Sequence, residues 1–224
     1  MRYLILGGTQ FVGLHIAEAA LTRGHEITLF HRGQTNPDAV PYAEHVLGDR
    51  DGGLGALGDR EFDRVVDVSG YVPRLVRASA ELLAGSTQHY TFISSESVYR
   101  EAGIARGIDE DAELFELDDP ATEEITGETY GGLKVLCERA VEDVYGRCSL
   151  IVRPGYVVGP GDHTDRFTYW IERIAEGGEV MAPGRPDRII QVVDGRDLGD
   201  WTIWMADRRR PGPYNASGPE YVLS

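Results

Sequence analysis

The stretch that decides the fold is Tyr3–Gly13, which reads YLILGGTQFVG. The apolar run Tyr3–Leu6 predicts a strand, and the apolar residues after the turn have helical spacing up to Gly24, where we expect the helix to end. A glycine-rich turn can be a simple tight connection, but between a strand and a helix it is typical of a dinucleotide-binding fold. Such glycines let the backbone approach a pyrophosphate at the helix N-terminus. The residues expected at that site are Gly7, Thr9, Gln10, Phe11, Val12 and Gly13.

Further strands follow at regular distances, with helical segments between several of them. The strands are predicted at Glu26–Phe30, His45–Gly48, Arg64–Val68, Tyr90–Ser94 and Ser149–Val152, and the helices at 74–84 and 129–145. This alternation predicts an α/β fold with a doubly wound parallel sheet, the Rossmann fold. Ligands of such sheets lie outside the carboxyl ends of the strands. Ser69, Gly70 and Ser95 follow strand ends, so we expect them to share one crevice with the glycine turn.

The end of the second strand bears on the choice of cofactor. An acid at this position would bind the ribose hydroxyls of NAD, but the sequence has His31 and then Arg32. A guanidinium here suits the 2′-phosphate of NADP, which makes NADP the preferred cofactor and NAD the alternative, unless Arg32 only faces solvent. After the third strand, Asp49 is expected near an adenine amino group and Arg50 near the phosphate, unless both are ordinary loop charges.

Tyr130 and Lys134 stand four residues apart in a predicted helix, so their side chains share one helix face. An ammonium held near a phenol favours the phenolate and lowers the tyrosine pKa, which suits a general acid/base near neutral pH. Lys134 is also the only lysine in the chain, beside 21 arginines. Two solvent-facing residues would show the same spacing, so the pair gains weight only from the other residues at the crevice.

The second half of the chain predicts a different organisation. The acidic stretch 101–128 reads as a long loop, either a lid over the crevice or a solvated insertion. We expect residues 1–155 to form an NAD(P)-binding Rossmann domain. Residues 156–224 are expected to form a mixed segment, partly a substrate cap and partly returning to the sheet, and incomplete at its C-terminal end. Within that segment we expect helices at 166–176 and 194–206 and strands at 189–193 and 212–216.

The bulk composition limits the partners. A net charge of −15 at pH 7 disfavours nucleic acids and anionic membrane surfaces, because both attract basic proteins. No apolar run approaches 18 residues, and glycine interrupts the first apolar stretch too early for a signal peptide. Cys137 and Cys148 form neither a metal-ligand pattern nor a disulfide framework. We therefore expect a cytoplasmic protein with a small-molecule substrate and without a metal site.

Seven stretches occur in order along the chain: GGTQFVG at 7–13, GDRD at 48–51, VVDVSG at 65–70, FISSESVY at 92–99, YGGLK at 130–134 with Glu138 after it, RPGYVVGP at 153–160 and QVVDGRDL at 191–198. Together they resemble the short-chain dehydrogenase/reductase superfamily, most of all its extended and atypical branch, the NAD-dependent epimerase/dehydratase family. The resemblance covers the chain from Tyr3 to about Pro219. It implies an NAD(P)-dependent reductase or epimerase, and a homodimer that forms through the Tyr130 helix and its neighbour.

The resemblance also implies roles for individual residues. Tyr130 would be the proton donor and acceptor, Lys134 would bind the nicotinamide ribose and lower the tyrosine pKa, and Ser95 would bind the substrate oxygen. Pro154 and Gly155 would line the nicotinamide pocket. Hydride would move between nicotinamide and a carbonyl or hydroxyl carbon, because the cofactor carries the redox chemistry and the protein positions it.

The sequence departs from the family pattern in three places. Gln10 stands where the first motif usually has a glycine, a change also found in relatives that resemble chloroplast RNA-binding proteins. Glu96 and Ser97 break the acid pair of nucleotide-sugar dehydratases, which disfavours a 4,6-dehydratase. Family members are also longer at the C-terminus. A non-catalytic dinucleotide-binding module that regulates or binds a partner is therefore the alternative function.

Overall fold

The structure, a computed structural model, describes residues 1–102, 107–182, 184–185 and 190–218. Its main element is a seven-stranded sheet in the order β3-β2-β1-β4-β5-β6-β9, and all neighbouring strands pair in parallel. The strands are β1 (Arg2–Leu6), β2 (Glu26–His31), β3 (Glu44–Leu47), β4 (Arg64–Asp67), β5 (Tyr90–Ile93), β6 (Ser149–Pro154) and β9 (Gly212–Ala216). The predicted doubly wound Rossmann sheet is thus confirmed.

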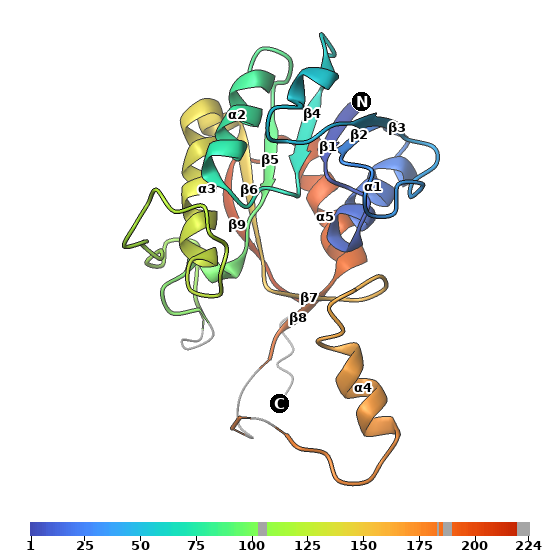
Figure 1. Cartoon of the computed structure of the whole chain (residues 1–224), viewed down its shortest axis with the longest axis vertical. Coiled ribbons are helices and arrows are strands. Elements are labelled where there is room, and N and C mark those ends of the chain that lie inside the picture. Colours follow the sequence, from blue (N-terminus) through green and yellow to red (C-terminus); the bar gives the residue numbers. More distant parts are fainter. Residues whose placement is uncertain (103–106, 183, 186–189, 219–224) are drawn as a thin grey trace.

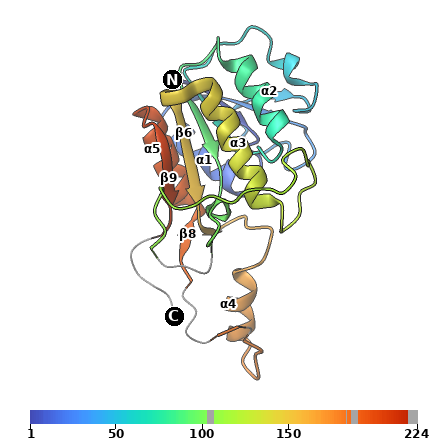
Figure 2. The same ribbon diagram turned by 90° about the vertical axis from the view of Figure 1, so that its left-hand side faces the viewer.

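Two helices cover each face of this sheet. The helix α1 (Phe11–Thr22) packs with α5 (Gly195–Asp207) on one face, and α2 (Pro73–Leu83) packs with α3 (Tyr130–Tyr145) on the other (Figures 1 and 2). Alternate residues of β1 serve the two cores: Tyr3 and Ile5 belong to the apolar cluster with α1 and α5, and Leu4 and Leu6 to the cluster with α2 and α3. Burial on both faces explains why the strands read as continuous apolar runs.

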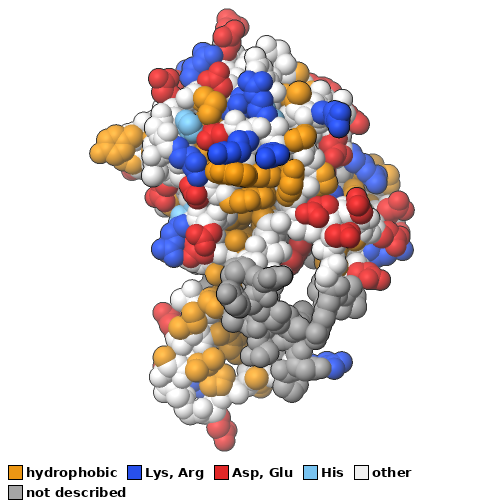
Figure 3. All heavy atoms as spheres, turned by 180° about the vertical axis from the view of Figure 1, so that it is seen from behind, with side chains coloured by type: hydrophobic (Ala, Val, Ile, Leu, Met, Phe, Trp, Pro, Cys, Tyr) orange, Lys and Arg blue, Asp and Glu red, His pale blue; other side chains and the backbone are white. Residues whose placement is uncertain are grey.

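A smaller part projects beyond the carboxyl edge of the sheet. It contains the two-stranded parallel pair of β7 (Tyr156–Val158) and β8 (Val192–Asp194), and the helix α4 (Thr168–Ala175) (Figure 1). No residue of α4 is buried, and Tyr169, Ile171 and Ile174 are exposed. Figure 3 shows hydrophobic side chains on this projecting part, and on the main body of that face a further hydrophobic patch among charged groups of both signs.

The predictions for residues 156–224 are met in part. The helices at 166–176 and 194–206 and the strand at 212–216 are observed, the helices with ends shifted by one or two residues. The predicted strand 189–193 begins at Ile189, which lies outside the described residues, and the observed strand β8 is Val192–Asp194. Strand β7 was not predicted, because three residues are too few to show a periodic pattern. How this segment divides between substrate cap and sheet stays a prediction.

The described part of the acidic loop, residues 107–128, is attached to the Rossmann sheet and its helices. The Asn215 backbone N–H donates to a Glu110 carboxylate oxygen (2.8 Å), and Arg74 forms ion pairs with both Asp51 and Glu123. Ile125 lines the first of the two cavities described below. Of the two interpretations of this loop, these contacts favour a lid over one part of the cleft rather than a freely solvated insertion. Among the described helices, none is both long and apolar enough to cross a membrane.

Candidate active site

The glycine turn between β1 and α1 has a backbone that requires glycine. Gly7 and Gly8 adopt φ values of +104° and +96°, which side chains disfavour. A Cβ on Gly13 would lie 2.8 Å from the Gly8 nitrogen, so only glycine allows α1 to approach the turn this closely. Phe11 has φ 39°, and such a conformation costs a non-glycine residue about 1–3 kcal/mol and is typical of functional sites.

Gln10, which replaces the usual glycine, does not distort the turn. Its backbone is extended (φ −145°, ψ 138°), a conformation that any residue adopts. Its side chain makes no capping hydrogen bond and lines both cavities of the cleft. The substitution therefore changes the side chain that faces a ligand, and the path of the backbone is kept.

A first cavity of about 430 Å³ opens beside the turn, at the carboxyl ends of β1, β2, β3 and β4. Its lining includes Gly7, Gly8, Thr9, Gln10, His31, Arg32, Gly33, Asp49, Arg50, Ser69, Tyr71 and Ile125. Arg32 is exposed, and within the described residues its guanidinium has no partner. Burial lowers the pKa of His31, and the neighbouring His45 lowers it further.

The structure argues against the expected phosphate contact of Arg50. Its guanidinium forms a two-pronged ion pair with the fully buried Asp67 and also donates from Nε to the Leu75 carbonyl (3.3 Å). Tyr90 donates to the same carboxylate (2.8 Å). Arg50 therefore neutralises a buried acid, whereas the guanidinium of Arg32 has no partner in the part of the chain that the structure describes. Asp49 lines the cavity as expected, while its carboxylate also accepts from the Asp51 N–H (2.9 Å).

Ser69 and Gly70 lie at the end of β4, but they have different surroundings. Ser69 lines the first cavity and donates from Oγ to the Leu6 carbonyl (3.2 Å). A Cβ on Gly70 would lie 2.4 Å from the Phe92 ring, so packing alone requires this glycine. The Gly70 carbonyl accepts from Lys134, so Gly70 is placed to orient a site residue.

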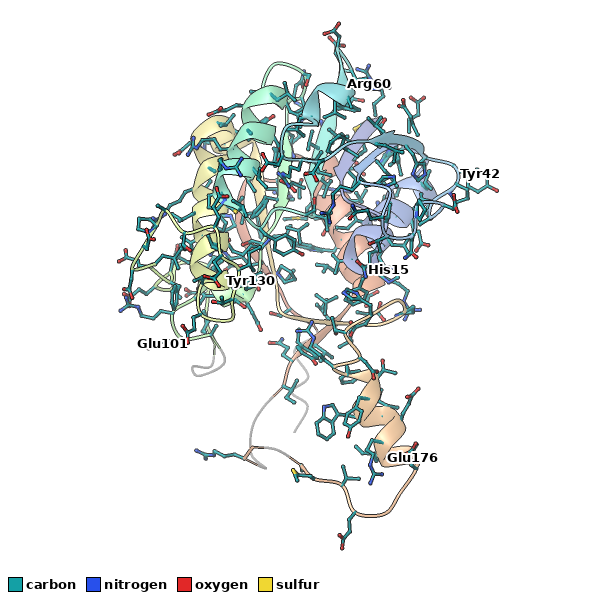
Figure 4. All side chains as sticks on the ribbon, viewed as in Figure 1. His15, Tyr42, Arg60, Glu101, Tyr130 and Glu176 are labelled. Atoms are coloured by element: carbon teal, nitrogen blue, oxygen red, sulfur yellow. The ribbon has the colours of Figure 1, made fainter. Side chains whose placement is uncertain are left out.

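A second cavity of about 470 Å³ continues the cleft towards the projecting part. It brings together residues that the sequence predicted from distant segments: Phe11, Val12, Gly13, Ser95, Tyr130, Lys134, Pro154 and Gly155. Two glycines of α3 make this possible. A Cβ on Gly131 would lie 2.2 Å from the Ser97 carbonyl oxygen, and a Cβ on Gly132 would lie 2.4 Å from the Leu117 side chain. The segment with Ser95 can therefore lie directly against the start of α3, where Figure 4 shows Tyr130.

Lys134 is buried, and its ammonium is held by backbone carbonyls. Nζ donates to Ile93 (2.7 Å) and Gly70 (2.8 Å), and it lies 4.6 Å from the centre of the Phe92 ring. An ammonium has three donors, so one N–H is left for another acceptor. Burial is the main cause that lowers the pKa of Lys134 to about 8.

The pKa of Tyr130 differs from the sequence expectation. Burial raises it, followed by the neighbouring Tyr71, while contacts with Ser95 and Arg166 lower it by less. The expected lowering by Lys134 is therefore wrong for this state of the protein, because the ammonium is turned to two carbonyls and is itself poorly solvated. A raised pKa keeps the phenol of Tyr130 protonated at neutral pH, which is the form that can donate a proton.

Three consecutive residues after β5 contribute polar groups to the second cavity. Ser95 Oγ accepts from the Ser97 N–H (3.1 Å), and Ser94 Oγ is buried without a hydrogen-bond partner among the described residues. A Cβ on Gly155 would lie 3.0 Å from a Glu96 carboxylate oxygen, and partial burial raises the pKa of Glu96. The cavity thus offers hydroxyls and a carboxyl group beside the phenol of Tyr130.

Sequence reasoning missed several residues of this cleft. Tyr71 lines both cavities, and its ring centre lies 6.4 Å from that of Tyr130. Its position directly after Ser69-Gly70, at a strand end, could have identified it. His163, Thr164 and Arg166 come from the loop before α4 and also line the second cavity. No local pattern marks these three, because only the tertiary fold brings the loop to the cleft.

The matches to known proteins agree with this geometry. A family model described as NAD dependent epimerase/dehydratase family matches residues 70–217, about two thirds of the chain. The chain belongs to the NAD-dependent epimerase/dehydratase family. This membership confirms the resemblance to the extended short-chain dehydrogenase/reductase branch. It also confirms the expectation that the chain belongs to a family of NAD-dependent enzymes.

Individual relatives are more distant. The chain is 26% identical to the chloroplast stem-loop binding protein of 41 kDa b from Arabidopsis thaliana over 239 aligned residues, covering 99% of this chain but only 60% of that relative. The fold is similar to UDP-N-acetylglucosamine 4-epimerase from Bacillus cereus (TM-score 0.73, 16% identity, 100% of this chain and 81% of that one). It is also similar to dTDP-glucose 4,6-dehydratase from Bacillus anthracis in complex with NAD (TM-score 0.77, 15% identity, 100% and 77%).

Proposed function

We propose that this chain is an NAD(P)-dependent oxidoreductase, a reductase or epimerase that moves hydride between nicotinamide and a carbonyl or hydroxyl carbon. The observation that carries the proposal is the cleft: Ser95, Tyr130 and Lys134 share the second cavity, and the first cavity, of similar size, adjoins it at the glycine turn. A dinucleotide has two halves joined by a pyrophosphate, and this cleft has two halves joined by a glycine turn at a helix N-terminus.

The residues present fit such a cofactor. At Gly13 a Cβ would collide with the turn backbone, and at Gly7 a side chain would strain the positive φ. The first turn of α1 offers backbone N–H groups to a pyrophosphate. Lys134 keeps one N–H for a ribose hydroxyl, and Ser94 Oγ is a buried hydroxyl without a partner in the described part of the chain. Pro154 and Gly155 line the same cavity.

The chain's own groups then supply the proton chemistry. The nicotinamide, when bound, supplies or takes up the hydride. In the reducing direction, the carbonyl carbon gains that hydride and its oxygen gains the Tyr130 proton, so that an alcohol forms. Ser95 would hold the same oxygen by a hydrogen bond. The carboxyl group of Glu96 lies in the cavity as a second group that can bind a substrate hydroxyl.

NADP is the cofactor that we propose over NAD, and Arg32 supports this choice. Its guanidinium lies at the cavity wall beyond β2 and has no partner among the described residues, at a position where an acid would otherwise bind the ribose hydroxyls of NAD. The similar 4,6-dehydratase structure contains NAD, so NAD stays the alternative.

The substrate that we propose is a small molecule. Similar structures contain UDP-glucose or UDP-glucuronic acid together with NAD, which supports a sugar-like substrate for this cleft. The name of the Arabidopsis relative refers to stem-loop binding, but a net charge of −15 opposes contact with a phosphate backbone.

Thermal unfolding with and without NADP or NAD tests the proposal. A ligand that binds only the native state at about 100 times its Kd should raise the Tm of a chain of this size by about 5–10 °C. Gly13→Ala should abolish this shift relative to the variant's own Tm, because its Cβ would meet the turn backbone. Gly85→Ala is the matched control, since nothing lies within 4 Å of its added Cβ. A wild type that neither cofactor stabilises would contradict the proposal.

A further inference from the structure

Two histidines form a hydrogen-bonded chain behind the adenosine end of the cleft. His31, the last residue of β2, is 8% exposed, and its Nδ1 accepts from the Gly33 N–H (3.1 Å). Its Nε2 lies 2.8 Å from Nδ1 of His45 on the neighbouring strand β3. Nε2 of His45 in turn lies 3.2 Å from the Val40 carbonyl oxygen. The contacts thus connect the turn that follows β2 to the strand beside it.

This arrangement permits one set of proton positions. The Gly33 N–H can only donate, so Nδ1 of His31 carries a lone pair and its proton is on Nε2. His31 therefore donates to Nδ1 of His45, whose own proton is on Nε2 and is donated to the Val40 carbonyl. Every contact is satisfied when both rings are neutral, and a proton added to either Nδ1 would break one of them. The lowered pKa of His31 agrees with a neutral ring.

The chain of contacts leaves His31 without a nitrogen for a ligand. Both ring nitrogens are engaged inside the protein, so His31 cannot accept a bond from a ribose 2′-hydroxyl as an acid at this position would. The same contacts fix the Gly33 N–H, and with it the turn that carries Arg32. Selectivity for NADP can come from removing a hydrogen-bond partner of the NAD ribose as well as from adding a cation for the 2′-phosphate.

We propose that His45, acting through His31, positions the Arg32–Gly33 turn so that the cleft selects NADP over NAD. His45 is not among the residues that line either cavity, so it is a positioning residue and makes no contact with the cofactor. The inference rests on the proposed function, since it assumes that the first cavity holds the adenosine half of the dinucleotide.

Dissociation constants for NADP and NAD in three proteins test it. His45→Leu removes the acceptor of the His31 proton and should weaken NADP binding about fivefold to tenfold, while NAD binding changes less than about twofold. His45→Asn keeps an acceptor oxygen near the place of Nδ1 and should restore most of the selectivity. Wild-type selectivity in His45→Leu would overturn the inference and leave the proposed function intact. A wild type that prefers NAD would overturn both the inference and the choice of NADP.

A second measurement reads the proton positions in the wild-type protein itself. The ¹⁵N shifts of the imidazole nitrogens in the wild-type protein at pH 7.5 should show His31 and His45 both protonated on Nε2 alone. His31→Gln identifies the signals of His31. A His31 ring that carries its proton on Nδ1, or that is charged at this pH, would overturn the inference.

Discussion

The two cavities of the cleft have similar volumes, about 430 and 470 Å³, but they are built in different ways. The first is walled largely by the glycine turn and by residues that directly follow β1 to β4. The second gathers side chains from β5, α3, β6 and the loop before α4, and it contains Ser95, Tyr130 and Lys134. The first cavity therefore depends mainly on local backbone geometry, whereas the second depends on tertiary contacts.

Tyr130→Phe should reduce turnover, which depends on the second cavity, without affecting cofactor binding. The variant removes the proton donor and keeps the ring, so kcat should fall by about 10²–10⁴-fold, while the cofactor Kd stays within about twofold. Steady-state kinetics and cofactor titration measure the two effects. The matched control is Tyr71→Phe, whose ring also lines the cavity and which should keep most of the activity. Equal turnover in Tyr130→Phe and wild type would remove Tyr130 from the mechanism.

Arg50→Gln should separate a structural cation from a binding one. The substitution leaves the buried carboxylate of Asp67 without its ion pair, so the free energy of unfolding should decrease by about 3–5 kcal/mol. Urea denaturation measures this change. A variant that keeps wild-type stability would contradict this structural role and favour the expected contact of Arg50 with the phosphate.

Arg32→Gln tests the other cation of the first cavity, for which we propose a binding role. Its guanidinium is exposed and free among the described residues, so the free energy of unfolding should change by less than about 0.5 kcal/mol. NADP affinity should instead decrease, by about tenfold, because one charge-assisted contact to the 2′-phosphate is lost. NAD affinity serves as the internal control and should not change.

The first half of the cleft could be predicted from the sequence because its signals are local. Gly7 and Gly13 mark the turn, and apolar runs mark the strands whose ends surround it. The ion pair of Arg50 could not be predicted in this way: its partner Asp67 lies 17 residues away, and spacing cannot show that the two charges neutralise each other.

The second half could be predicted only through the family resemblance. The motif residues Ser95, Tyr130 and Lys134 do meet in one cavity, but their electrostatics were not visible in the spacing. From the spacing we expected the Lys134 ammonium to lower the pKa of Tyr130, whereas burial is the largest cause of the pKa shifts of both residues. Arg166 comes from a loop whose position only the fold determines.

The single lysine allows the most direct test of the central claim, that a dinucleotide binds where Tyr130 and Lys134 meet. Folding lowers the pKa of Lys134 from 10.5 to about 8, because burial disfavours the charged ammonium. The unfolded chain therefore holds this proton more tightly, and the contribution of Lys134 to the free energy of unfolding rises as the pH increases from about 8 to 10.5.

Protein labelled with ¹³C and ¹⁵N only in lysine gives one Nζ signal, which can be titrated against pH with and without NADP or NAD. We expect a midpoint near pH 8 in the free protein and a change of the signal when the cofactor is added, as the third N–H of Lys134 gains an acceptor. A midpoint near 10.5 together with a signal that neither cofactor moves would contradict the account.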